Sequence, residues 1–448
     1  MIKKVFLLVI SLVLAGCASI PTQLDIQSGP DIAPEAQQEF AYYTPSGPSF
    51  NATSQEIVSG FLAAGTSPLN DYAVAREFLS DDFAQRWNPE NQTVIRAGAP
   101  VFREAGDSLV VVELSAGARI DEQGRYEDSV ELSTTNLRFR VALQDGQWRI
   151  SSAPNLTVVT PPVFSVVFNA FPVYFLDSST ESLVPDLRWF PTKTSTPTRL
   201  VNALLAGPSA WLSSGVRSAI PEGTQLTISA VRILDRVAQI DLDSDALAAG
   251  QQDRRSMLGQ LRSTLLQLPG VDDISLSVNG AFQDIAPGGA EPNDEMSLSY
   301  VLRPTGVEPL TSIGSMPLTG TQTMVANYDP ELIAITDNGD QVAFTTAEGV
   351  FELTNQSLRV EITKLSSLID VVALAYDNSG SLWAFPSDAS LPVEVYDQTT
   401  VVRTLASPFL GLRLAAAIAP EGTRVVQSIQ TEDAESFLDV GVVLRDAN

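Results

Sequence analysis

A short N-terminal segment determines how the rest of this chain is interpreted. Lys3 and Lys4 precede an apolar run that ends in Leu14-Ala15-Gly16-Cys17. About ten apolar residues cannot cross ~30 Å of hydrocarbon, so the run is typical of a cleaved secretory signal rather than a spanning helix. Its ending has the pattern of a bacterial lipobox, in which the small residues Leu14, Ala15 and Gly16 let the lipoprotein signal peptidase reach the backbone. Residues 1–16 are therefore predicted to be a signal peptide.

Cleavage would leave Cys17 as the first residue of the mature chain, with a diacylglycerol on its sulfur. Two or three acyl chains such as palmitate, at ~0.8 kcal/mol per buried CH₂, anchor a protein durably. The predicted location is the outer face of the cell membrane, with the lipid as the one covalent attachment and no other cofactor. The alternative is an ordinary signal peptide followed by a chance cysteine.

The residue composition excludes several kinds of chemistry. Cys17 is the single cysteine and histidine is absent, so disulfides, thiolate nucleophiles, Ser-His-Asp triads and zinc sites built on His or Cys are excluded. The formal net charge is -26, and losing Lys3 and Lys4 with the signal peptide makes it -28. A body this acidic is repelled by phosphate backbones, so nucleic acid is not an expected partner. The length of 448 residues suggests about three domains.

Residues 17–50 and 51–157 have different patterns. The first range is rich in proline and polar residues and predicts a flexible, lipidated tether. The second opens with Thr53-Ser-Gln-Glu56, a capping box, and continues with a second helix from about Asn70. Strands are predicted over 108–114, 130–143 and 148–150. Helices followed by a curved antiparallel sheet resemble the cone of NTF2-like domains, and we favour a scaffold over a ligand-holding cone because no ligating cluster accompanies the strands.

The pattern over residues 163–285 predicts a split β-α-β domain. It consists of a strand over 163–176, a helix capped at Thr196 before Pro197, and a hairpin of strands 226–234 and 237–242. A second helix with Met257 and Leu261 on its apolar face and a strand over 271–278 follow. We expect both helices to cover one face of a single sheet.

Several segments together resemble a known family. Phe171–Asp177, Leu204–Pro208 and Gln260–Val271 are similar to a GerMN domain. With the lipobox and the segments Ile57–Ala64 and Tyr72–Leu79, the chain resembles the LpqB lipoproteins of actinobacteria. The resemblance implies that the partner is the extracellular region of an MtrB-like sensor histidine kinase. It also implies that the protein regulates this two-component system in envelope homeostasis and division.

The region 296–448 contains a repeated strand-turn-strand pattern. Its turn glycines, Gly339, Gly380 and Gly422, recur at a spacing of about 41–42 residues, which is typical of β-propeller blades. About 150 residues supply three or four blades, at the bottom of the usual range of ~4–8. The region is therefore predicted to be an abbreviated β-propeller with an incomplete ring. The predicted fold class is multidomain, α+β followed by all-β.

An acidic segment and three aromatic residues resemble parts of binding sites, but structural functions explain them better. Asp241-Leu-Asp243-Ser-Asp245 resembles the start of a calcium loop, but Ala246 and Gln252 stand where such a loop needs glycine and glutamate. A strand end leading into a helix N-terminus explains these carboxylates better. No metal site is predicted. The aromatic residues Trp211, Trp383 and Phe385 could bind a ligand, but core packing is the favoured interpretation.

The sequence offers no catalytic site. Lys193 and Lys364, the two lysines of the mature chain, have Phe190 and Glu361 rather than serine three residues earlier. The resulting hypothesis is a non-enzymatic lipoprotein that regulates a sensor kinase. One alternative is a lipoprotein that binds cell-wall glycan or a small ligand, and another is a hydrolase that uses two carboxylates.

Overall fold

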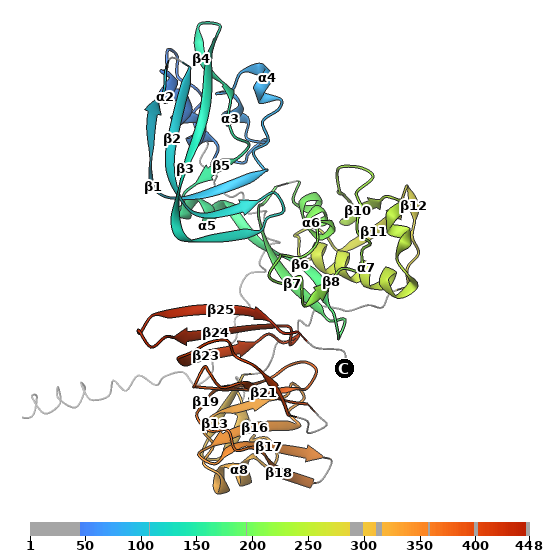
Figure 1. The fold of residues 1–448 in the computed structure, drawn as a ribbon. Helices are drawn as coiled ribbons and strands as arrows, with labels where there is room; N and C mark the ends of the chain where they lie inside the picture. The colour runs from blue at the N-terminus through green and yellow to red at the C-terminus, as the bar shows by residue number, and fades with distance from the viewer. Residues whose placement is uncertain are drawn as a thin grey trace, which may run out of the picture. The chain divides into compact units, whose positions relative to one another are not determined.

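The computed structural model describes residues 45–106, 108–193, 195–286, 299–310, 316–356, 359–397 and 402–444. The predicted signal peptide, Cys17 and the tether up to residue 44 lie outside these ranges. Strands dominate the described residues (Figure 1). Within the described residues, no helix is both long enough and apolar enough to span a membrane.

The first sheet is curved and covered by short helices. Its strand order is β4-β3-β2-β1-β5, in which β1 to β4 form an antiparallel meander and β5 runs parallel to β1. The strands are β1 (Gln92–Glu104), β2 (Leu109–Asp121), β3 (Tyr126–Gln144), β4 (Gln147–Ser152) and β5 (Thr157–Val159). The helices are α2 (Ser54–Ala64), α3 (Ala73–Arg76) and α4 (Asp81–Ala84).

The packing of this sheet follows from its sequence pattern. Burial alternates strictly along β2, so every second side chain faces the helices. The predicted capping box is confirmed, because the Glu56 N–H donates to Thr53 Oγ1 at 3.2 Å and the Thr53 N–H donates to Glu56 Oε2 at 2.8 Å. Phe61 on α2 lies edge-on to Trp87, with ring centroids 5.0 Å apart. The core of this region therefore lies between α2 and the sheet.

The single second helix predicted from about Asn70 is wrong. The structure has two one-turn helices, α3 and α4, with an extended break between them. At the break the Ile150 N–H donates to the Phe78 carbonyl and the Ser80 N–H donates to the Ile150 carbonyl, both at 2.9 Å. Pairing with the edge strand β4 thus replaces helical hydrogen bonds that the apolar spacing alone suggested.

The next region contains two small sheets rather than the single predicted one. One sheet has the order β7-β6-β8 and the other β12-β11-β10-β9. The strands are β6 (Phe168–Asp177), β7 (Leu183–Pro191), β8 (Val216–Arg217), β9 (Arg232–Leu234), β10 (Val237–Leu242), β11 (Asp273–Val278) and β12 (Ala281–Phe282). The helices are α5 (Pro161–Val167), α6 (Thr196–Leu205), the 3₁₀ helix η1 (Ser244–Ala248) and α7 (Gln251–Leu265).

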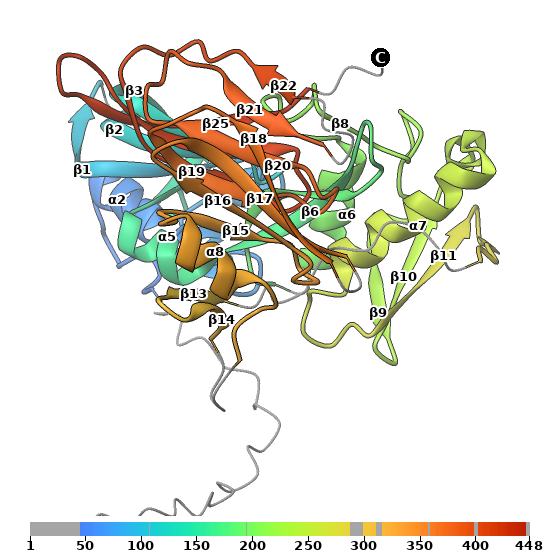
Figure 2. The ribbon, with the colours of Figure 1, turned by 90° about the horizontal axis from the view of Figure 1, so that it is seen from below.

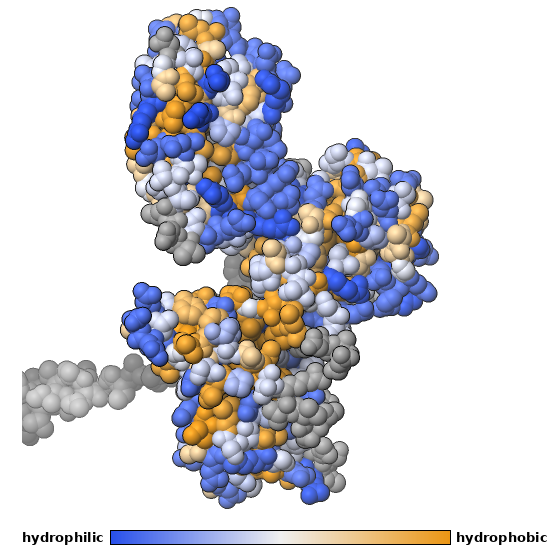
Figure 3. Space-filling view, in the orientation of Figure 1, coloured by the Kyte–Doolittle hydropathy of each residue, from blue (hydrophilic) through white to orange (hydrophobic). Residues whose placement is uncertain are grey.

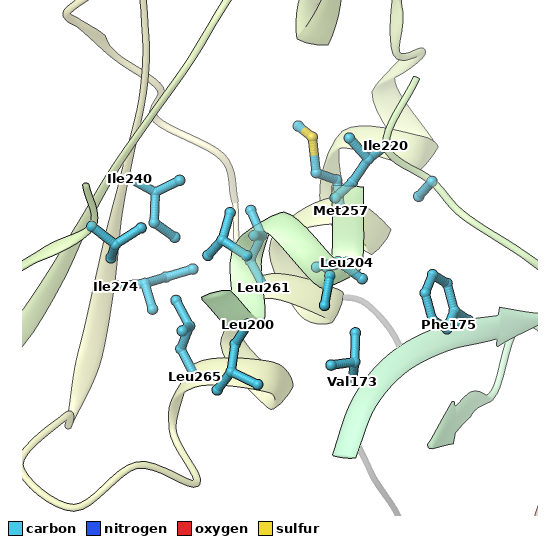
Figure 4. Packing of buried hydrophobic residues seen from close by; sticks show 14 of the residues in the cluster. Val173, Phe175, Leu200, Leu204, Ile220, Ile240, Met257, Leu261, Leu265 and Ile274 are labelled. Atoms are coloured by element: carbon cyan, nitrogen blue, oxygen red, sulfur yellow. The ribbon is translucent and has the colours of Figure 1, made fainter. Parts of the chain in front are cut away.

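A shared apolar core joins the two sheets. Figure 4 shows Leu200 and Leu204 of α6 and Leu261 of α7 among side chains from both sheets, including Val173 and Ile240. Helix α7 contacts β6 of one sheet and β11 of the other. The strands β10 and β11 are parallel, as a β-α-β crossover through α7 requires. The split β-α-β order is therefore present, with α7 bridging two sheets.

Three local features of this region differ from the prediction. The segment from Val163 to Val167 is helical rather than extended, because Thr160 caps α5 and prolines 161 and 162 occupy its first turn. Strand β7 was not predicted. The predicted strand over 226–234 is reduced to β9 and one isolated bridge between Leu226 and Leu242. The hairpin turn itself is confirmed, since Asp235 and Arg236 have the positive φ angles of 48° and 64° that a tight turn needs.

The C-terminal region consists of antiparallel sheets that follow one another along the chain. A two-stranded sheet of β13 (Tyr300–Arg303) and β14 (Gly306–Pro309) precedes α8 (Thr321–Asn327). Two four-stranded sheets follow, made of β15 (Ile333–Ile335), β16 (Gln341–Thr346), β17 (Gly349–Gln356) and β18 (Arg359–Ser366), and of β19 (Val371–Tyr376), β20 (Leu382–Pro386), β21 (Val393–Tyr396) and β22 (Val402–Leu405). The last sheet comprises β23 (Leu412–Ile418), β24 (Arg424–Gln430) and β25 (Ser436–Val442).

The predicted strand-turn-strand repeat is present in each of these three sheets. Gly339, Gly380 and Gly422 lie in the turns between the first two strands and have positive φ angles of 71°, 77° and 74°. These sheets follow one another in the ribbon (Figure 2), and apolar side chains of neighbouring sheets pack together. Ala343 of β16 shares a cluster with Leu382 of β20, and Phe385 shares a cluster with Ile418 of β23.

Candidate functional site

One candidate site among the described residues is a cleft of about 690 Å³. This volume lies within the range of ~300–1,000 Å³ that is usual for ligand pockets. Apolar and aromatic side chains form most of its wall. The lining residues are Arg125, Tyr126, Glu127, Pro185, Asp186, Leu187, Trp189, Ser209, Ala210, Trp211, Ala417, Ile418, Ala419, Arg424, Val425, Val426 and Val440.

A buried ion pair lies beneath one wall of the cleft. Arg188 Nη2 donates to Asp186 Oδ2 at 2.8 Å, and both side chains are almost completely buried. Ser209 completes the cluster, because its N–H donates to Asp186 Oδ2 at 2.7 Å and its hydroxyl donates to Oδ1 at 2.9 Å. Arg188 also donates to the Gly207 carbonyl at 3.0 Å. Sequence reasoning missed this cluster, although the alternating pattern of a strand would have placed Asp186 and Arg188 on one face.

The electrostatics of this cluster favour a structural function. Burial lowers the pKa of Arg188 to about 10, while the Asp186 carboxylate opposes that shift. Both Asp186 oxygens accept hydrogen bonds, so the carboxylate is a poor candidate for a general base. The cluster fixes the strand β7 and the loop that contains Ser209, and both contribute residues to the cleft.

Aromatic rings give the cleft its apolar character. Trp189 lies 6.2 Å from Tyr126 and 5.1 Å from Phe164, measured between ring centroids. Trp211 is 46% exposed, so the prediction that it packs in a core is wrong. Trp383 and Phe385 are 2% and 1% exposed, and core packing is confirmed for both. Of the three aromatic candidates from the sequence, Trp211 alone lines the cleft.

A second polar cluster surrounds Glu90. Lys193 Nζ lies 2.6 Å and Arg199 Nη1 3.5 Å from Glu90 Oε1, and Lys193 also lies 4.3 Å from the centre of the Tyr72 ring. Burial opposes ionisation of Glu90, but Arg199 and Lys193 outweigh it and hold its pKa below the ordinary value. Lys193 is therefore engaged in a charged network and is not a free nucleophile. The other mature lysine, Lys364, lies on β18 with its Nζ 5.7 Å from the Phe351 ring.

The acidic motif at residues 241–245 has the structural function that the sequence favoured. Asp241 Oδ1 accepts a hydrogen bond from the Gly280 N–H at 2.8 Å, and Asp243 caps η1 by accepting from the Asp245 N–H at 3.2 Å. Over the described ranges, no group of three or more His, Cys, Asp or Glu side chains is arranged to hold a metal ion.

Comparison with known proteins identifies the family. Residues 47–165 match the family described as "Lipoprotein LpqB, N-terminal domain". "Lipoprotein LpqB" of Bifidobacterium longum is 27% identical over 96% of this chain and 76% of that protein. "Lipoprotein LpqB" of Cutibacterium acnes is 28% identical over 64% of this chain and 48% of that protein. The chain belongs to the LpqB lipoprotein family. The family resemblance predicted from the sequence is confirmed.

A second family model matches residues 172–284, and the relatives show how much of an LpqB protein this chain covers. Residues 172–284 match the family described as "Sporulation and spore germination", in agreement with the predicted GerMN domain. The first GerMN domain of the sporulation protein GerM from Bacillus subtilis is 21% identical, with a TM-score of 0.23, and covers 28% of this chain and 95% of that one. The matches span about three quarters of the Bifidobacterium relative and about half of the Cutibacterium relative.

Membership of the LpqB family implies membrane anchoring, because the relatives are named as lipoproteins. Cys17 and the lipobox residues Leu14, Ala15 and Gly16 lie outside the described residues, so lipidation remains a prediction from the sequence.

Proposed function

We propose that this LpqB-family protein is a lipid-anchored, non-enzymatic regulator on the outer face of the cytoplasmic membrane. Its partner would be the extracellular region of an MtrB-like sensor histidine kinase, through which it would tune envelope homeostasis and division. The observation that carries the proposal is the lipobox ending in Cys17, in a chain whose relatives are named as LpqB lipoproteins. The carboxylates of Asp186, Glu90 and Asp241 are consistent with it, since they are engaged with arginine, lysine and a backbone N–H group, respectively.

The proposal includes three extracytoplasmic modules, namely an NTF2-like cone over 51–157, a GerMN domain over 163–285 and an abbreviated propeller over 296–448. The curved sheet around α2 supports the cone. The order of the last three sheets supports the propeller, because the first strand of each sheet neighbours the first strand of the next. Strand β19 contacts both β15 and β23, as inner propeller strands do.

The tether would supply the regulatory mechanism. A lipid at Cys17 and a flexible segment up to about residue 50 would confine the modules to the membrane surface and raise their effective concentration at a membrane partner. Weak intrinsic affinity would then be sufficient. If one conformation of the kinase binds better than another, the difference in binding free energy shifts the kinase equilibrium by that amount.

Crosslinking in intact membranes tests this proposal. Mild crosslinking and capture of the full-length lipoprotein should enrich the sensor kinase from wild-type membranes. A C17S variant is expected to enrich it less, because it lacks the lipid. Expression of the variant at the wild-type level controls for its abundance. If the wild-type protein captures no more kinase than a mock purification does, the proposal fails.

A second candidate function is binding of a cell-wall glycan or a small ligand. The observation that favours it is the cleft, in which the exposed ring of Trp211 and the ring of Trp189 could stack on a sugar face. Solubilised wall fragments should then quench tryptophan fluorescence, and W211A should remove most of that response. Equal quenching in the wild type and in W211A would exclude the cleft as the binding site.

A further inference from the structure

The last sheet differs from the two before it in one respect. The sheets β15–β18 and β19–β22 each have four strands in sequential order, whereas the sheet β23-β24-β25 has three. By this order β25 occupies the third position, which β17 and β21 occupy in the other sheets. In those sheets a fourth strand pairs with the outer side of the third. Among the residues that the structure describes, no strand pairs with the outer side of β25.

The hydrogen-bonding register shows which backbone groups of β25 face outward. The Val443 N–H donates to the Thr423 carbonyl and the Thr431 N–H donates to the Glu435 carbonyl, so odd-numbered residues face β24 at both ends of the pairing. Antiparallel pairs alternate between bonded and non-bonded positions. Residues 436, 438, 440 and 442 therefore direct their N–H and carbonyl groups to the free edge.

The same residues carry exposed apolar side chains. Leu438 is 69% and Val440 51% exposed, and the cross-strand partner of Val440 is Val426, which in turn pairs with Ala417. The only charged residue of β25, Asp439, accepts a hydrogen bond from Gln427 Nε2 at 3.2 Å. Figure 3 shows apolar surface over these strands.

The outer strand β18 differs from β25 in its charged side chains. Strand β18 carries Arg359, Glu361 and Lys364, and such charges protect an exposed edge against unwanted pairing. Strand β25 has neither proline nor lysine, and its one carboxylate is bonded within the sheet. An edge with free backbone groups and alternate apolar side chains is the feature that strand-adding recognition sites use.

The surroundings of the edge indicate the charge of its occupant. The turn that leads into β25 carries Glu432, Asp433 and Glu435, all exposed. Its carboxylates lie next to the first residues of the edge and would attract a cation there. A second copy of this chain would bring the same negative charge, on a body of net charge -26, to the interface. A basic segment is therefore the better electrostatic complement.

We infer that the outer edge of β25 binds an extended segment of a partner protein, which adds as a fourth strand and carries alternate apolar side chains next to basic residues. Main-chain hydrogen bonds to Leu438 and Val440 would supply affinity, and the Glu432–Glu435 turn would select lysine or arginine at the end of the segment. The inference goes beyond the proposed function and does not depend on which protein supplies the segment.

A synthetic peptide tests the inference on the full mature chain. The probe is a fluorescent peptide of alternating valine and threonine with two lysines at each end. Its controls are the same peptide with a central proline and one with glutamates in place of the lysines. Anisotropy should show that the lysine peptide binds more tightly than both controls and that higher salt weakens it. Hydrogen exchange should show new protection at the amides of 438 and 440, while those of 439 and 441 do not change.

The variant V440P separates binding from folding. It removes an outward N–H and leaves the β24–β25 hydrogen bonds in place, so the fold should be retained. Its peptide affinity should fall about tenfold or more, which corresponds to ~1.4 kcal/mol. V440K offers an independent test should V440P not fold. T363K, which makes the same charge change on β18, is its matched control and should bind as the wild type does.

Three results would overturn the inference. One is equal affinity of the peptide for V440P and the wild type. Another is new protection on strands other than β25. The last is a concentration-dependent dimer in sedimentation that V440P abolishes, because that result would assign the edge to a second copy of the chain.

Discussion

The carboxylate of Asp177 accepts a 2.6 Å hydrogen bond from the hydroxyl of Thr423, which lies 246 residues further along the chain. Asp177 ends strand β6, and Thr423 directly precedes β24. The same carboxylate accepts hydrogen bonds from the Ser179 and Thr180 N–H groups at 2.8 and 2.7 Å. Burial opposes ionisation of Asp177, but these hydrogen bonds outweigh it and lower its pKa to about 2. Asp177 therefore joins two regions of the chain as a charged group.

This hydrogen bond predicts an acid-dependent loss of stability. The folded-state pKa of about 2 is below the ordinary value of 3.8, so the stabilisation is present above pH 3.8 and is lost as the pH falls toward 2. T423V removes one donor and should lower the free energy of unfolding at neutral pH by about 1 kcal/mol. The difference from the wild type should shrink when Asp177 is protonated.

Urea unfolding at neutral pH and at about pH 2, below the ordinary carboxyl pKa, measures this effect. T431V is the matched control, because the Thr431 hydroxyl donates to the Glu435 carbonyl in an exposed turn. It should change the stability by less than ~0.5 kcal/mol at either pH. A difference between T423V and the wild type that stays constant with pH would contradict the assignment to Asp177.

The buried pair of Asp186 and Arg188 should be far more sensitive to substitution than an exposed one. D186A leaves the Arg188 guanidinium buried without its carboxylate and should cost about 3–5 kcal/mol in the free energy of unfolding. The double variant D186L/R188M removes both charges and should recover most of that loss. In the exposed pair of Arg236 and Asp272 both side chains are well solvated, so D272A should leave the stability unchanged. A double variant as unstable as D186A would contradict this explanation.

Two tryptophans that looked alike in the sequence should respond differently. W383A removes a buried ring and a 2.9 Å hydrogen bond from Trp383 Nε1 to Asp377 Oδ2, so it should cost about 3–5 kcal/mol. W211A removes an exposed ring and should change the stability by less than ~0.5 kcal/mol. Thermal unfolding of both variants checks this difference. A large loss of stability in W211A would show that its ring supports the fold.

Local sequence signals predicted much of the fold because they act over a few residues. The Thr53–Glu56 capping box, the turn at Asp235 and the glycine turns of the C-terminal sheets depend on neighbouring backbone, and each is present in the structure. The failures involve long-range pairing. The break between α3 and α4 depends on hydrogen bonds to Ile150, about 70 residues away in the sequence, which no local periodicity encodes.

The candidate site was less predictable than the fold. The cleft combines residues from Arg125 to Val440, and no spacing in the sequence brings them together. The exposure of Trp211 depends on which neighbours cover it, so its chemistry alone favoured the core. The Lys193–Glu90 pair, with an N–O distance of 2.6 Å, likewise joins residues that are distant in the sequence. A scarce lysine in an acidic chain was the one signal that could have pointed to it.

Lipidation at Cys17 can be tested independently of the kinase. Cells grown with labelled palmitate should incorporate the label into the wild-type chain, and intact-mass measurement should show the loss of residues 1–16. C17S should carry no label and keep the precursor mass, because no other cysteine can accept the diacylglycerol. A18S changes the neighbouring residue without removing the thiol and should be labelled normally. A mature wild-type chain with a free thiol at its N-terminus, recovered from the medium, would contradict the anchor and the mechanism that depends on it.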